Sequence, residues 1–136
     1  MTETLRLEIV TPVATAFAED VHMVTLPAIE GEMGIYPQHM RLITQIVPGE
    51  VIVTKDGATR SFAVGEGLVE ITATRVSIVT DMAIQAEQID EALVEAARQR
   101  AAARLAEKIS DEEVASVNAS LARSLAQLHV KRRKRT

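Results

Sequence analysis

Short alternations of apolar and polar residues fill the first part of the chain and predict β-strands. Leu5, Leu7 and Ile9 alternate with polar neighbours, which places the three side chains on one face of a strand. Asp56-Gly57 lies between two further alternating runs, and this dipeptide is a strong local signal for a β-hairpin. Regular short strands of this kind are typical of a β-sandwich or a barrel. The predicted strands fall at 5–10, 21–26 and 35–36, from 41 onward, and at 51–53, 62–64, 68–71 and 75–79.

The period of the pattern changes between residues 86 and 109. Ile89, Leu93, Ala97 and Ala101 recur four positions apart, which predicts a helix whose buried face is mostly alanine. In this interpretation Leu93 belongs to the core of the helical part.

A second helix is expected to begin at Ser110. A Glu follows three positions later, at Glu113, and the two residues form a capping-box pattern. An apolar stripe then runs along the predicted helix at Val114, Val117, Leu121, Leu125 and Leu128. Two helices joined by so short a turn form an antiparallel hairpin, which buries little area and is expected to be marginally stable without contact to another surface.

Turn-forming residues end early in the chain. All four prolines lie in the first 48 residues, and all six glycines lie between residues 31 and 67. Long helices therefore become possible only in the later part. The predicted fold class is α+β, with an antiparallel β-sandwich domain over 1–84 followed by a two-helix hairpin with a basic tail over 85–136.

A charged, glycine-rich segment follows the strand that ends near Leu26. Pro27 has no N–H to donate to a neighbouring strand and is expected to end that strand. Gly31 and Gly34 bracket Glu32-Met33, which predicts a tight turn with positive φ.

Composition excludes several kinds of site. The chain has no cysteine, so it forms neither a disulfide nor a thiolate zinc site. No apolar run approaches the ~20 residues of a spanning helix, and we expect membrane association only through a partner.

Charge is distributed unevenly. Residues 1–84 carry 5 basic and 11 acidic residues, whereas residues 85–136 carry 10 basic and 8 acidic residues.

Candidate catalytic groups are few. Glu30 and Glu32 could form a carboxylate pair, but no neighbouring His, Asp or Glu cluster completes a catalytic or metal site, and a solvated turn is the simpler interpretation. The segment also lacks the Lys-Ser/Thr end of a phosphate-binding loop. His39 by itself is more often a structural hydrogen-bonding residue than a base or ligand. We therefore expect no enzyme activity, no metal and no cofactor.

Basic residues gather at the end of the chain. One hypothesis is a β-sandwich adaptor whose basic tail binds nucleic acid. Base stacking has little support, because the aromatic residues are Phe17, Tyr36 and Phe62, all remote from the tail in sequence. A solvated helix end, with basic side chains complementing the helix dipole, is the plainer alternative.

The residues from Leu26 to Thr44 read Leu-Pro-x-x-x-Gly-Glu-x-Gly-Ile-x-Pro-x-His-x-x-Leu-Ile-Thr. This pattern resembles the signature of the epsilon subunit of bacterial F-type ATP synthases. The later Pro48-Gly49 pair, the run 65–71 and the alanine-rich helices extend the resemblance over nearly the whole chain. Gln38 stands where the family usually has Gly, and Arg41 where it usually has Pro.

The resemblance implies a non-catalytic rotor subunit in the central stalk, which couples ion flow to ATP synthesis. Its β-sandwich would contact the gamma subunit and the c-ring, and the subunit would lie peripherally on the cytoplasmic face of the bacterial inner membrane. No nucleic acid is implied as a partner. The residues implied at the interface loop are Glu30, Gly31, Glu32, Gly34 and His39.

The resemblance also assigns a regulatory role to the helices. In the family the C-terminal helix can extend and place basic residues against an acidic part of the catalytic α/β subunits, which inhibits ATP hydrolysis. The basic residues at matching places are Arg123, Lys131, Arg132, Arg133, Lys134 and Arg135.

A nucleotide site is only weakly indicated. Ile89 and Asp90 match a family sequence linked to ATP binding, and Arg100 falls where another family arginine contributes. Leu93, however, replaces the arginine of that sequence, and leucine has no donors for a phosphate. We therefore interpret Asp90 as a first-turn carboxylate favoured by the helix dipole.

Overall fold

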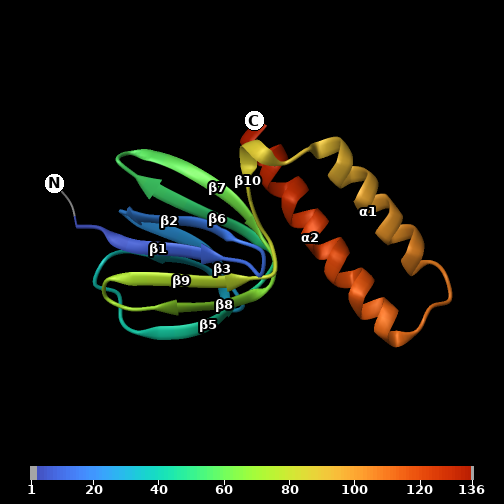
Figure 1. Ribbon diagram of the computed structural model, residues 1–136, viewed down its shortest axis with the longest axis horizontal. Coiled ribbons are helices and arrows are strands. Elements are labelled where there is room, and N and C mark those ends of the chain that lie inside the picture. Colours follow the sequence, from blue (N-terminus) through green and yellow to red (C-terminus); the bar gives the residue numbers. More distant parts are fainter. Residues whose placement is uncertain (1–2, 136) are drawn as a thin grey trace.

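The computed structural model describes residues 3–135, without the side chain of Arg135. A β-sandwich lies at one end of the molecule and two packed helices at the other (Figure 1). This architecture confirms the predicted α+β class. The strands are β1 (Leu5–Val10), β2 (Thr15–Val21), β3 (Met23–Ala28), β4 (Gly31–Ile35), β5 (Leu42–Ile46), β6 (Gly49–Lys55), β7 (Ala58–Val64), β8 (Gly67–Ile71), β9 (Arg75–Thr80) and β10 (Ala83–Gln85).

The strands form one hydrogen-bonded sheet in the order β10-β7-β6-β3-β5-β8-β9-β1-β2, with β4 pairing to β3. Neighbouring described strands run antiparallel, apart from the parallel pair of β1 and β9. The sheet folds back on itself, so that β2 approaches β6. The Glu19 carboxylate on β2 joins these parts, because it accepts from Lys55 Nζ at 2.9 Å and from Arg60 Nη1 at 3.2 Å.

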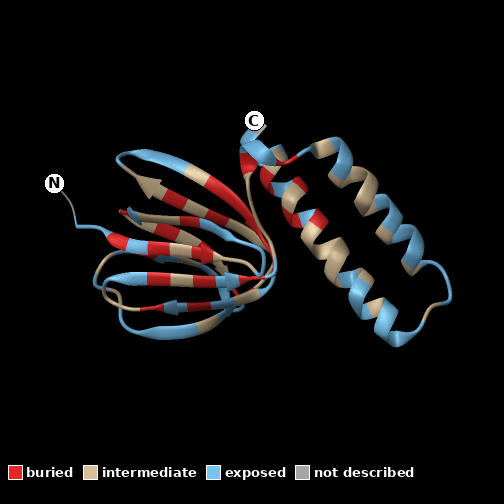
Figure 2. Cartoon of the chain, viewed as in Figure 1, coloured by how far each residue is buried: buried red, intermediate tan, exposed pale blue. Residues whose placement is uncertain are grey.

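Buried residues alternate with more exposed ones along the strands (Figure 2), and the buried residues form one apolar core cluster. Leu5, Leu7 and Ile9 are all buried, as their alternation predicts. Phe17 and Phe62 meet edge to face with ring centroids 5.4 Å apart. Aliphatic residues provide the rest of this core, which explains how a chain with so few aromatic residues closes a sandwich.

Two predictions for the glycine-rich segment are wrong. Pro27 lies inside β3, paired with Glu32 of β4, and its carbonyl oxygen accepts from the Val47 N–H at 2.9 Å. Residues Gly31 to Gly34 belong to β4 and do not form a turn. The turn lies before Gly31, at Ile29-Glu30. Gly31, the residue that follows the turn, has a positive φ of 128°.

The helical part begins with a 3₁₀ turn, η1 (Ala86–Gln88), followed by α1 (Glu91–Leu105) and α2 (Asp111–Arg135). The Asp90 carboxylate caps α1 by accepting from the Leu93 N–H at 3.2 Å. The Ser110 hydroxyl accepts from the Glu113 N–H at 3.2 Å, as the capping pattern predicts for the start of α2. No described helix is long and apolar enough to cross a membrane.

The prediction that Leu93 belongs to the core is wrong, because its side chain is 69% exposed. Ile89, from which the apolar period was counted, lies before the cap and is not part of α1. Val94, the residue after Leu93, packs against the buried cluster around Ile89 instead.

Candidate functional site

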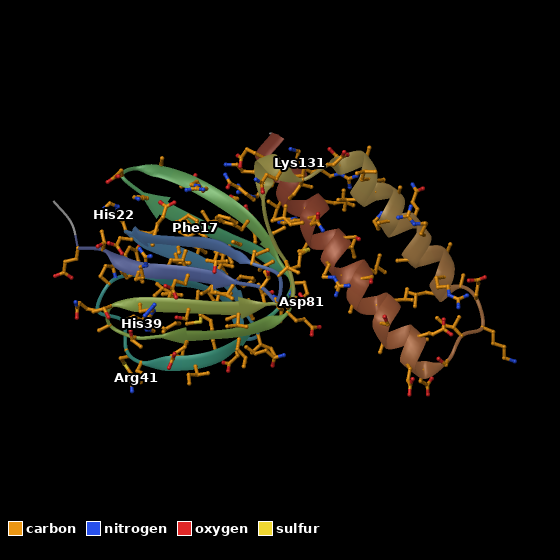
Figure 3. All side chains as sticks on the ribbon, in the orientation of Figure 1. Phe17, His22, His39, Arg41, Asp81 and Lys131 are labelled. Carbon is orange, nitrogen blue, oxygen red and sulfur yellow. The ribbon has the colours of Figure 1, made fainter. Side chains whose placement is uncertain are left out.

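The structure separates the residues predicted for the interface loop. Glu30 and Glu32 are exposed beside the β3–β4 turn, at the end of the sandwich that faces α2. His39 lies at the opposite end (Figure 3). Its Nδ1 is 2.6 Å from the Met40 carbonyl oxygen, which is a local structural contact. Gly34 lies on β4, the strand that runs between the two ends. The interface residues therefore form two surfaces rather than one loop.

A cleft of about 640 Å³ separates the acidic turn from α2. Gly31, Glu32 and the Pro48-Gly49 turn line one wall. The opposite wall belongs to α2 and includes the partly exposed Leu125. The acidic turn thus lies close to α2.

The last part of α2 packs against the sandwich through apolar side chains. Val130 is fully buried among Ala63, Ala86 and Ile89. Leu128, two positions earlier, is also buried. The first half of α2 extends away from the sandwich and packs with α1 (Figure 1). None of the fifteen residues of α1, all of them described, is buried. The hairpin therefore contacts the sandwich mainly through one end of α2.

Arg133 binds the sandwich next to this apolar contact. Its Nε lies 2.7 and 3.0 Å from the two carboxylate oxygens of Glu50, and its Nη2 also bonds this carboxylate. The Nη2 donates a further hydrogen bond to the Ser61 hydroxyl at 3.2 Å. The hydrogen bonds to Glu50 raise the pKa of Arg133. This is the bidentate geometry in which arginine binds carboxylates most strongly.

Arg132 joins the two helices to each other. Its Nε lies 2.8 Å from Glu91 Oε2, and its Nη2 lies 3.0 Å from Glu95 Oε1. Arg98 on α1 also bonds the Glu95 carboxylate. Arg98 first, and then Arg132, lower the pKa of Glu95 to about 2.

The other described basic residues of the tail also have partners. Lys131 Nζ donates to the Ala86 carbonyl oxygen at 3.3 Å. Lys134 contributes to the lowered pKa of Glu87, after the larger effects of a backbone N–H and the Gln85 side chain. Arg123, in the middle of α2, pairs with Asp81 at 3.3 Å.

Arg132 and Arg133, although each is nearly half exposed, therefore find their carboxylates on α1 and on the sandwich, and not on α2 itself. Arg135 belongs to the same predicted tail, but its side chain lies outside the described residues. Sequence periodicity could not show these contacts. The Arg133–Glu50 pair joins residues 83 positions apart, and no local pattern relates them.

The residues of the weak nucleotide signal are not assembled into a site. Ile89 is buried in the apolar cluster, and Asp90 caps α1. Arg100 is exposed on α1, about 15 Å further along the helix axis than Asp90. The described residues contain no group of three or more His, Asp or Glu side chains that could bind a metal.

The fold and these contacts define a β-sandwich protein with a C-terminal helical hairpin docked on it. Two family models match the chain. The beta-sandwich domain of the ATP synthase Delta/Epsilon chain matches residues 4–86, and the long alpha-helix domain of the same chain matches residues 87–132.

Curated relatives agree with the family models. The ATP synthase epsilon chain of Herpetosiphon aurantiacus is 36% identical and covers 96% of both chains. That of Pelotomaculum thermopropionicum is 42% identical over 78% of this chain and 79% of its own. The chain therefore belongs to the ATP synthase epsilon chain family, as a non-catalytic central-stalk subunit of an F-type ATP synthase.

Two solved structures share the fold. A chain of the Euglena gracilis mitochondrial ATP synthase superposes with a TM-score of 0.77 at 22% identity, and the match covers 93% of this chain and 79% of that one. A chain of the Tetrahymena thermophila mitochondrial enzyme gives 0.59 at 11% identity, covering 99% and 98%.

Proposed function

We propose that the sandwich, residues 1–84, contacts the gamma subunit and the c-ring and couples ion flow to ATP synthesis. Both of the solved structures described above come from assemblies, one described as OSCP/F1/c-ring and the other as central stalk/c-ring. The exposed acidic turn at Glu30 and Glu32 supports a docking role, because these carboxylates are free of core packing. Association with the membrane, at the cytoplasmic face of the bacterial inner membrane, is peripheral and passes through the complex.

The hairpin, residues 85–136, regulates in this proposal. Its C-terminal helix leaves the sandwich, extends and places its basic residues against an acidic surface of the catalytic α/β subunits, which inhibits ATP hydrolysis. The supporting observation is the limited docking of the hairpin, which contacts the sandwich mainly through the last part of α2. Such a contact is within reach of the binding free energy of a partner.

The ion pairs of the tail are compatible with an exchange of partners. The side chains of Arg132 and Arg133 are 48% and 44% exposed. Solvent reaches both guanidinium groups, so carboxylates of another subunit can approach them and compete with the internal ones. Long-range attraction to an acidic surface would favour the encounter.

Deleting residues 110–136 tests the regulatory role. The sandwich is expected to stay folded and to assemble, because its main core cluster contains no residue of α2. ATP hydrolysis by the complex should rise. Replacing all five basic residues at 131–135 by glutamine should produce part of this rise, and the difference should shrink as salt concentration increases. Unchanged hydrolysis in both variants would refute inhibition by the tail.

The alternative of a nucleic-acid-binding adaptor gains no support. Arg132 and Arg133 pair with carboxylates of the same chain. Phe17 and Phe62 lie buried in the sandwich, where they cannot stack on bases.

A further inference from the structure

A carboxylate and a hydroxyl of the sandwich meet where the end of α2 docks. Glu50 lies at the start of β6, and Ser61 lies in β7. The Glu50 side chain is only 10% exposed, and Ser61 is fully buried. Both bond Arg133, and the two carboxylate oxygens and the hydroxyl match the fork of N–H groups on a guanidinium. We call this pair, Glu50 and Ser61, the guanidinium site.

The contacts of Arg133 and Arg132 have different consequences for motion. Arg133 joins α2 to the sandwich, whereas Arg132 joins α2 to Glu91 and Glu95 at the start of α1 and in its first half. A hairpin that leaves the sandwich as one body breaks the Arg133 contact and keeps those of Arg132. The guanidinium site therefore acts on docking of the whole hairpin, and not on its internal packing.

We propose that the guanidinium site withholds the basic end of α2 from its partner. Glu50 and Ser61 bind Arg133 in place of an acidic partner surface and so keep this end of α2 docked. One guanidinium cannot present the same fork of N–H groups to Glu50 and to a partner carboxylate together. Docking and partner binding therefore compete for Arg133. The competition with the catalytic subunits rests on the function proposed above, whereas control of docking by Glu50 does not.

A second contact between α2 and the sandwich provides an internal comparison. Arg123 reaches Asp81 through a single 3.3 Å contact, and the Asp81 side chain is 43% exposed. An exposed, singly bonded pair contributes little. Loss of one partner from a poorly solvated, bidentate pair has a larger effect, because the remaining charge keeps its desolvation cost. The guanidinium site is therefore the ionic contact on which docking depends most.

The experiment measures docking in the isolated full-length subunit. The chain has no cysteine, so cysteines introduced at the exposed positions Thr59 and Ser116 accept two spin labels without side reactions. The distribution of distances between the labels reports the ratio of undocked to docked hairpin. Glu50→Gln and Arg133→Gln should each raise this ratio about tenfold. Combining them should add little, because both remove the same contact.

Three control variants make the result specific. Glu70→Gln removes the same charge from β8, where the described residues show no ion pair for Glu70, and should leave the distribution unchanged. Asp81→Asn should raise the ratio less than Glu50→Gln. The exchange Glu50→Arg with Arg133→Glu should restore docking relative to either single reversal. If Glu50→Gln leaves docking unchanged, or if the exchange does not restore it, the proposal is wrong.

Hydrolysis by the assembled complex separates this proposal from the function on which it rests. Glu50→Gln frees a complete basic tail and should lower ATP hydrolysis, whereas Arg133→Gln removes a residue of the inhibitory surface and should not lower it. Altered docking with unchanged hydrolysis in both variants would overturn the competition with the catalytic subunits but not the docking role of Glu50. Unchanged docking together with raised hydrolysis after tail deletion would overturn the guanidinium site alone.

Discussion

Val130→Ala should release the hairpin from the sandwich without unfolding either part. Val130 is the fully buried residue of α2 in the cluster with Ala63, Ala86 and Ile89. The substitution removes two carbons, about 1.6 kcal/mol of transfer free energy at ~0.8 kcal/mol per buried CH₂. The cavity left behind brings the total to about 2 kcal/mol. The higher helix propensity of alanine acts on the docked and the undocked helix alike, so it cancels.

A change of about 2 kcal/mol shifts the ratio of undocked to docked hairpin about thirtyfold. Distances between spin labels at positions 59 and 116 would show this shift, and the melting temperature of the sandwich should stay the same. Val117→Ala is the matched control, because Val117 lies in the first half of α2, which extends away from the sandwich (Figure 1). If Val130→Ala shifts the distances no more than Val117→Ala does, docking does not depend on this cluster.

Three further results are expected. Glu32→Ala should change the free energy of unfolding by less than ~0.5 kcal/mol, since the side chain is exposed. The same variant should impair the coupling of ion flow to ATP synthesis in the complex, and impaired folding with normal coupling would contradict the interface role. Titration of the isolated subunit should show weak or no ATP binding, because Ile89, Asp90 and Arg100 are not assembled into a site, and saturation at micromolar ATP would refute this. Arg98 and Arg132 lower the pKa of Glu95 from 4.5 to about 2, so the ionised carboxylate stabilises the packing of α1 on α2 above pH 4.5. This stabilisation is lost as the pH falls toward 2, and Glu95→Gln should remove the pH dependence in thermal melts.

Local patterns predicted both helices and most of the strands, but they missed β2 and β10 and placed a turn within β4. Alternation placed Leu5, Leu7 and Ile9 in the core, because a strand sends every second side chain to the same face. The pairing of Ser110 with Glu113 located the start of α2, since a cap acts within a single turn. Such features depend on neighbours in sequence, so they can be predicted without knowledge of the tertiary structure.

Predictions failed where the outcome depended on distant residues. Pro27 remains in a strand that pairs with β4, and Val47, twenty residues later, donates to its carbonyl oxygen. The predicted apolar stripe of the first helix was wrong, because Ile89 lies before the cap of α1. Ile89 packs instead with Val130, near the end of the chain. The partners of the basic tail could not be predicted for the same reason.

The arrangement of the basic residues suggests an order for opening the hairpin. Val130, Arg133 and Arg123 contact the sandwich, so undocking breaks an apolar contact and two ion pairs. Arg132 contacts α1, so extension of α2 requires a second step that separates the helices. Salt weakens exposed ion pairs but leaves apolar burial largely unaffected. Increasing salt should therefore promote separation of the helices more than undocking, because a buried valine supports docking, whereas no residue of α1, all of which are described, is buried against α2.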